Sequence, residues 1–359
     1  MKFKIIDLYI AKKFIGAVVF TLLLTAVISS IFDISEKLDN MIQNGVTLKI
    51  ALVYYLSFIP NIINLTSPML IFIASLFFTA RLANDTEFVA LLSSGVSYYR
   101  LLLPYIVVGL MLTGTDLIMK NYLVPYAYRN VLAFELKYVQ VRYDNDARNI
   151  HKQLDNNSFF YIHDVDLNNN IVHLLSIEKF DKQKLIYKLN AQEARMDTVH
   201  NNWHLHNYYT RTFDGMHEHI TRGDSMILKL PITKEDFTQK VRASPAMTTP
   251  QLSKFIEEES FKGENLNNFY LIEKYRRQSY PFAIFVLVMI SVAIATRKVR
   301  GGIGAHIMIG ILIAISFELF MRFSTTFSTN GNLPPLISVW IPNFFYSCVA
   351  VYLLYKTPK

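Results

Sequence analysis

Six long runs that are almost free of charged side chains constrain the fold of this sequence more than any motif does. A helix needs roughly 20 apolar residues to cross the hydrocarbon core of a bilayer. The runs that reach this length are Phe14 to Phe32, Ile50 to Ala80, Leu101 to about Tyr122, Gln278 to Thr296, Ile303 to about Phe323, and Leu336 to Tyr355. The sequence therefore predicts six transmembrane helices, three before and three after a polar middle segment.

Lysine and arginine indicate the orientation of these spans, because cytoplasmic connections carry an excess of both. If the spans alternate, one side holds Lys2, Lys4, Lys12, Lys13, Arg81, Arg100, Arg297, Lys298, Arg300, Lys356 and Lys359 against only Asp7, Asp85 and Glu87. We expect both termini in the cytoplasm and the polar middle segment outside. A cleaved signal peptide is the alternative interpretation of the first run, but no clear small-x-small site closes it.

The second run is longer than a bilayer requires and contains polar residues and prolines in its middle, between Pro60 and Pro68. Broken backbone and polar groups at membrane depth are tolerated where they face protein or a water-filled cavity. Two interpretations stay open: a kinked helix packed in a bundle, and a helix that lines a cavity.

The polar middle segment, residues 125–265, has the pattern of an all-β domain followed by an amphipathic helix that starts near Thr249-Pro250. Turn-forming residues at Asp166–Asn170, Asn201–Asn202 and Asp214–Gly215 separate its apolar runs. The predicted strands are Ser158–Ile162, Ile171–Phe180, Leu185–Ala194, Trp203–Thr212 and Met226–Leu230. An antiparallel sandwich or an open barrel follows from this pattern.

The sequence offers little support for catalysis or cofactors. Its one cysteine, Cys348, excludes an internal disulfide and a cysteine-based metal site. No phosphate-binding loop, nucleophile elbow or zinc-protease motif is present, so we predict no catalytic residue, metal or cofactor, and no ATP hydrolysis by this chain itself. The net charge of +8 fits the orientation of the spans, and we predict no nucleic-acid partner.

A short segment between the second and third spans, residues 84–94, is predicted to form a helix that ends at Gly95. Phe88, Leu91 and Leu92 lie on one stripe of this helix, and Glu87 flanks them. Such a helix either lies in the lipid interface or docks into a groove of a partner protein.

Several cations fall on the side that usually carries few of them: Lys37, Lys120, Lys274, Arg276, Arg277 and Arg322. The spacing of Asp116 with Lys120 and of Glu318 with Arg322 predicts ion pairs within one helix, and Glu273 neighbours the cluster at Arg276 and Arg277. Alternatively, these cations form a ring for lipid phosphates. We take Lys37, Arg276, Arg277 and Arg322 as candidate lipid-binding residues.

Taken together, the order of parts and three short strings resemble the LptF/LptG permeases of the bacterial lipopolysaccharide exporter. The strings are DLYIAKKF from Asp7, TEFVALLSSG from Thr86, and LPPLI from Leu333 followed by Ile341-Pro342. The resemblance covers essentially the whole chain, and its ends are more similar to LptG than to LptF.

This resemblance implies an α-helical membrane protein of the bacterial inner membrane, with six transmembrane helices and an inserted periplasmic, jellyroll-like β domain. Residues 1–124 hold the first three helices and a coupling helix at 84–94, residues 125–265 the β domain, and residues 266–359 the last three helices. The implied partners are an LptF-like permease in a heterodimer, an LptB-like ATPase dimer, and LptC-like and LptA-like periplasmic proteins. The implied cargo is lipopolysaccharide.

By the same resemblance, Glu87, Phe88, Leu91, Leu92 and Gly95 belong to the helix that couples to the ATPase. One departure concerns the outer end of the first span, where family members often carry a lysine that meets lipid phosphate. This sequence has Asp33 there, with Lys37 one turn later, so we do not transfer that contact.

Two other functions remain open from the sequence. The first is a membrane-embedded lipid-modifying enzyme, with Asp116, Glu318 or a histidine of the β domain as acid or base, because acidic residues lie inside the spans. A structural scaffold, whose β domain only recruits other proteins, is the third possibility.

Overall fold

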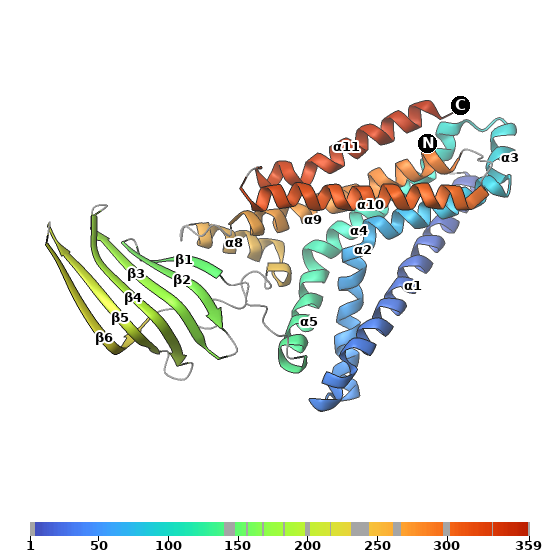
Figure 1. The fold of residues 1–359 in the computed structure, drawn as a ribbon. Helices are drawn as coiled ribbons and strands as arrows, with labels where there is room; N and C mark the ends of the chain where they lie inside the picture. Colours follow the sequence, from blue (N-terminus) through green and yellow to red (C-terminus); the bar gives the residue numbers. More distant parts are fainter. Residues whose placement is uncertain are drawn as a thin grey trace. The chain divides into compact units, whose positions relative to one another are not determined.

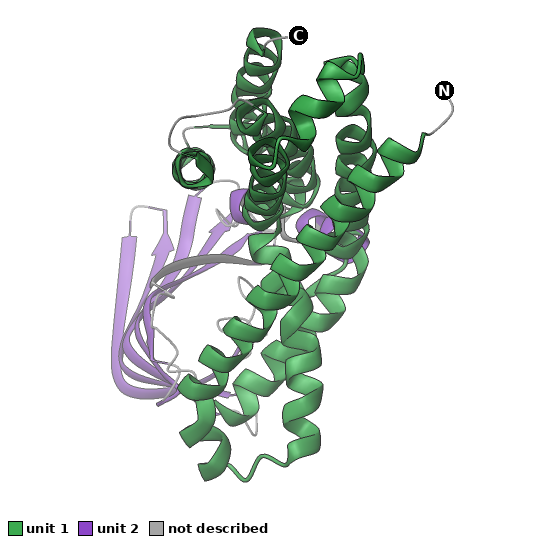
Figure 2. Ribbon diagram, turned by 90° about the vertical axis from the view of Figure 1, so that its right-hand side faces the viewer, with its two compact units in different colours: residues 1–139, 246–249, 271–359 green, residues 140–245, 250–270 purple. Residues whose placement is uncertain are grey.

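The computed structural model describes residues 4–139, 148–155, 157–166, 169–181, 184–197, 202–215, 217–230, 244–260, 267–296, 302–331 and 333–357 (Figure 1). Some residues used in the sequence predictions lie outside these ranges. They are five of the cations that indicate the orientation, Lys2, Arg297, Lys298, Arg300 and Lys359, and three residues of the predicted turns, Leu167, Asn168 and Asn201. The chain divides into a helical unit, residues 1–139, 246–249 and 271–359, and a β unit, residues 140–245 and 250–270 (Figure 2).

Six helices of the described chain are long and apolar enough to cross a membrane, as the charge-free runs predict. Their elements are α1 (Ile5–Gln43), α2 (Leu48–Asn84), α4 (Tyr98–Ile118), α9 (Asn267–Ala295), α10 (Gly302–Thr329) and α11 (Pro335–Lys356). The third extends beyond the predicted end near Tyr122, because a π-helical turn, Met119–Leu123, joins α4 to α5 (Val124–Tyr138) without a break.

The core of the helical unit forms around α9, whose apolar part is mostly buried, whereas α1 and α10 have only a small share of their apolar residues buried. Small residues let the helices approach closely: Ser75 and Ser291 share a hydrogen bond of 2.6 Å, and a Cβ atom on Gly310 would lie only 2.7 Å from Leu76. Close contact between small and polar residues is what holds helices together in lipid, where hydrophobic burial gives no preference.

The described strands of the β unit form an antiparallel sheet in the order β1-β2-β3-β4-β5-β6. The strands are β1 (Arg148–Asp155), β2 (Ser158–Asp166), β3 (Ile171–Asp181), β4 (Lys184–Asp197), β5 (Asn202–Asp214) and β6 (His217–Lys229). All five predicted strands are present and longer than expected, and β1 is an additional one. Two predicted turns contain left-handed residues, Asn170 and Gly215.

One row of residues interrupts the ladder at the same level in β2 to β6: His163, Leu174, Gln192, Asn207 and Asp224. The residue pairs on both sides of this row follow the same register. Along β2, β3 and β4, however, the residues that face the core are even-numbered on one side of the row and odd-numbered on the other. Leu174 and Asn207 have positive φ angles of 53° and 51°. The register does not shift across the row, so the row is not a bulge; it marks the line at which the strands change the set of residues that they turn toward the core.

A bend in the sheet brings its two halves face to face. Phe160 on β2 and Trp203 on β5 have ring centroids 6.1 Å apart, although strands three positions apart in a flat sheet are separated by about 14 Å. Figure 2 shows the resulting deep curve of the sheet. The described strands thus form a single folded-over sheet, which is closer to the open-barrel prediction than to a sandwich of two separate sheets.

After the sheet, α8 (Thr249–Ser260) begins at the predicted Thr249-Pro250. Leu252 and Ile256 on its apolar face are buried, and the Phe255 ring packs edge-on against Tyr270 at 5.0 Å. The amphipathic prediction for this segment is confirmed.

Candidate functional site

The predicted coupling segment forms a helix of seven residues, α3 (Glu87–Ser93), between α2 and α4. Left-handed residues flank it, with φ of 59° at Thr86 and 84° at Gly95. Left-handed residues at these two positions allow sharp changes of chain direction, so α3 is a separate helix and does not continue α2 or α4.

The apolar stripe of α3 packs on the protein itself. Phe88 is 2% exposed and lies edge-on to Tyr98, and Leu91 and Leu92 pack on the same core. The surface of α3 is formed instead by Val89, which is 46% exposed, together with Ala90, Ser93 and a half-exposed Glu87.

Glu87 connects α3 to α1. Its carboxylate accepts a hydrogen bond of 3.0 Å from the Tyr9 hydroxyl and lies 3.5 Å from the Lys13 ammonium, which also bonds Tyr9. Nearby, the buried Asp7 at the start of α1 pairs with Arg100 in the first turn of α4. The start of α1 is therefore tied by charge both to α3 and to α4.

Lys37 lies in a tight cluster with two carboxylates. Its ammonium is 2.7 Å from Asp33, 2.9 Å from Glu135 on α5, and donates a hydrogen bond of 2.6 Å to the Tyr54 hydroxyl. Tyr54 and Tyr55 both donate to Asp33. Since two anions already surround one cation, this cluster is a structural link between α1, α2 and α5 and is unsuited to a phosphate in this conformation.

A second polar group is buried between α2, α4 and the π-helical turn. Asp116 and Lys120 are 7% and 6% exposed and form an ion pair of 2.8 Å, and the Ser67 hydroxyl donates to Asp116 at 2.9 Å. The Lys120 ammonium also lies 4.9 Å from the centroid of the Tyr280 ring on α9. The predicted pairing of Asp116 with Lys120 is confirmed, and it places a full ion pair inside the bundle.

The three candidate arginines differ in how far they are engaged. Arg277 is buried, pairs with Glu273 at 3.1 Å and donates to the Met247 carbonyl at 2.7 Å. Arg276 stacks 4.5 Å from the Tyr280 ring centroid. Arg322 has a side chain that is 76% exposed and, among the described residues, a single polar side-chain contact, a long one of 3.4 Å with Glu318. Only Arg322 of the three presents most of its guanidinium to the surroundings.

The acidic residues that the enzyme interpretation requires are engaged as well. Asp116 is ion-paired to Lys120, and Glu318 accepts from Tyr280 at 3.2 Å and pairs with Arg322. Within the part of the chain that the structure describes, no group of three or more His, Cys, Asp or Glu side chains is arranged to hold a metal ion.

A model of the family described as "Lipopolysaccharide export system permease LptF/LptG" matches residues 8–356, nearly the whole chain. The chain belongs to the LptF/LptG family. A search of curated proteins found no match.

Membership explains the architecture. LptF/LptG proteins are permeases of the lipopolysaccharide export system, and the six apolar helices make this LptF/LptG permease a multi-pass inner-membrane protein. It belongs to a transporter family. The family model covers both LptF and LptG, so the similarity of the chain ends to LptG stays a prediction.

Sequence reasoning missed the contacts between helices that hold these sites. The partners in two of these ion pairs lie more than 90 residues apart in the sequence: Asp7 with Arg100, and Lys37 with Glu135. No local spacing in the sequence indicates such pairs. The sequence did contain one signal for such a contact. Asp7 is an acid at the start of a membrane-spanning helix, and an ionised group there requires a partner of opposite charge.

Proposed function

We propose that this chain is a passive, membrane-spanning half of an exporter, which extracts lipopolysaccharide from the inner membrane and passes it to a periplasmic bridge. In this proposal a separate ATPase dimer of the LptB type supplies the energy. A second permease of the LptF type completes the transmembrane pathway, and LptC-like and LptA-like proteins receive the cargo. Both termini face the cytoplasm and the β unit faces the periplasm.

The observation that carries this proposal is the position of α3. Its apolar stripe is anchored in the core of the helical unit, and Glu87 joins it to α1. Displacement of α3 by a partner is therefore transmitted to α1. Because few of the apolar residues of α1 are buried in the helical unit, its remaining surface is available to lipid, cargo or a second subunit.

The docking surface of α3 follows from the same geometry. Phe88, Leu91 and Leu92 fix the helix to its own protein, and we assign the partner contact to Glu87, Val89 and the small residues Ala90 and Ser93. A convex two-turn helix with a small-residue face suits insertion into a groove on a partner.

Isolation of the intact protein in mild detergent tests the proposed assembly. We expect an ATPase subunit, a second permease and lipopolysaccharide to accompany the chain through purification. A chain that purifies alone and free of lipopolysaccharide would contradict the proposal.

We further propose that Arg322 binds a lipid phosphate, because its guanidinium is largely exposed and only weakly paired. Arg276 is the next candidate, whereas Lys37 and Arg277 hold the structure together. Replacing Arg322 by glutamine is expected to weaken lipopolysaccharide binding about tenfold at low salt, the value of one charge-assisted contact. The matched control is Glu318→Gln, which frees Arg322 and is expected to keep or strengthen binding. If the wild-type chain and Arg322→Gln bind lipopolysaccharide with equal affinity, Arg322 does not contact the lipid phosphate.

A further inference from the structure

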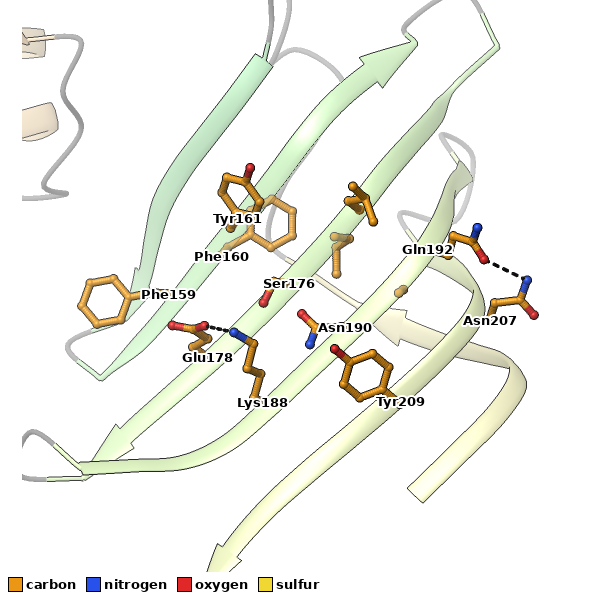
Figure 3. Close-up of a pocket in the computed structure, with 13 residues that line it drawn as sticks. Phe159, Phe160, Tyr161, Ser176, Glu178, Lys188, Asn190, Gln192, Asn207 and Tyr209 are labelled. Atoms are coloured by element: carbon orange, nitrogen blue, oxygen red, sulfur yellow. Dashed lines mark hydrogen bonds and ion pairs between the residues drawn. The ribbon is translucent and has the colours of Figure 1, made fainter. Parts of the chain in front are cut away.

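A cavity of about 650 Å³ lies on the outer face of the folded sheet, opposite its apolar core (Figure 3). Most of its lining residues alternate along their strands with the inward-facing Phe160, Leu175, Leu189 and Ala191. A cavity of this size is within the range of small-ligand sites. The permease mechanism described above makes no use of it.

The centre of the cavity is a single cross-strand row of four residues. Tyr161 on β2 is opposite Ser176 on β3, Ser176 is opposite Asn190 on β4, and Asn190 is opposite Tyr209 on β5. Two small polar side chains therefore lie between two tyrosine rings (Figure 3). Strand spacing separates the tyrosines by about 14 Å, which leaves a trough with aromatic walls and a polar floor.

The floor offers hydrogen-bonding groups that the described chain does not use. Ser176 is 9% exposed, and its hydroxyl has no hydrogen-bond partner among the described residues. The Asn190 amide likewise makes no hydrogen bond to any residue within the described ranges, while Gln192 and Asn207 bond each other at 3.4 Å beside it. A buried hydroxyl without a partner costs free energy, so its presence at a cavity floor points to a ligand that supplies the bond.

The charges that line the cavity do not favour an anionic ligand. Its one cation, Lys188, pairs with Glu178 at 2.6 Å, so the lining is close to neutral. An acyl chain fits poorly too, because it would leave Ser176 and Asn190 without partners. A ligand with neutral hydroxyl groups and apolar C–H faces satisfies both the polar floor and the aromatic walls.

We propose that this trough binds the pyranose rings of an oligosaccharide, with Tyr161 and Tyr209 stacking on sugar faces and Ser176 and Asn190 bonding sugar hydroxyls. Assigning those sugars to the polysaccharide part of lipopolysaccharide rests on the proposed function. A protein partner is less suited to this place, because peptides add to sheets at edge strands, and the trough lies on the central ones.

The test measures binding of three probes to the full-length protein in detergent by calorimetry. The probes are the lipid-free polysaccharide released from lipopolysaccharide by mild acid, the remaining lipid part, and a tetramer of N-acetylglucosamine as an unrelated glycan. We expect the polysaccharide to bind, Tyr209→Ala and Asn190→Ala each to weaken this binding about tenfold, and Tyr209→Phe to retain most of it. Binding of the lipid part should be the same for all variants.

The matched control is Ile186→Ala, which removes an exposed apolar side chain from the same outer face of β4 outside the cavity. The proposal is wrong if no glycan binds the wild-type protein, or if the cavity variants behave as Ile186→Ala does. Binding of the N-acetylglucosamine tetramer without the polysaccharide supports a sugar site and separates it from export. Failure of the permease proposal is seen independently, in the absence of a co-purifying ATPase.

Discussion

Replacing Lys120 by methionine is expected to lower the free energy of unfolding by about 3–5 kcal/mol, the cost of leaving one charge of a buried pair without its partner. Asp116 would remain 7% exposed inside the helical unit, where the Ser67 hydroxyl is its one remaining hydrogen-bond donor among the described residues. The measurement is unfolding of the full-length protein in mixed micelles by increasing amounts of denaturing detergent.

A double variant separates the buried charge from the loss of packing. Asp116→Asn combined with Lys120→Met removes both charges, while the amide oxygen introduced at position 116 can still accept from Ser67, so most of the stability should return. The control is Arg322→Met, which breaks the exposed pair with Glu318 and should cost less than about 1 kcal/mol. If Lys120→Met costs no more than Arg322→Met, the buried pair does not hold the helices together.

Reversing the charge of Glu87 is expected to reduce association with the ATPase at least tenfold, because the proposed docking surface would then present a lysine in place of a carboxylate. The measurement is the amount of ATPase that purifies with Glu87→Lys relative to the wild-type chain. Asp85→Lys is the matched control, since Asp85 is an exposed acid close to α3 but outside it.

Glu87 also contacts Lys13 within the chain, and a charge swap distinguishes the two roles. Lys13→Glu combined with Glu87→Lys restores the internal pair and keeps the surface charge reversed. If the carboxylate meets the ATPase directly, the swap stays defective, whereas full recovery assigns Glu87 to the internal contact alone. Lys13→Met, which leaves Glu87 in place, should keep the ATPase.

The helical part of this fold was predictable because lipid imposes a simple rule: a spanning helix requires a long apolar run. All six runs are helices. Their ends were not predictable from apolarity, since the π-helical turn and α5 continue the third helix into polar sequence. Ion pairs one turn apart, such as Asp116 with Lys120, followed from spacing, but the pairs between distant helices did not.

The helix α3 illustrates a limit of pattern reasoning. The stripe of Phe88, Leu91 and Leu92 is visible in the sequence, but a stripe does not state whether it faces a partner or its own core. The structure turns it inward, against Tyr98 and its neighbours. In the β unit, β1 was missed because its sequence is largely polar, and the line at which the strands change their core-facing residues was missed because Leu174 and Asn207 take left-handed conformations without a glycine.

The central claim is that a separate ATPase drives this chain to move lipopolysaccharide. The most direct measurement reconstitutes the purified permease complex in vesicles that contain labelled lipopolysaccharide and follows its transfer to an added periplasmic acceptor. The proposal predicts transfer that requires ATP and the ATPase subunit and is lost with Glu87→Lys. Transfer at an undiminished rate without ATP or without the ATPase subunit would contradict it.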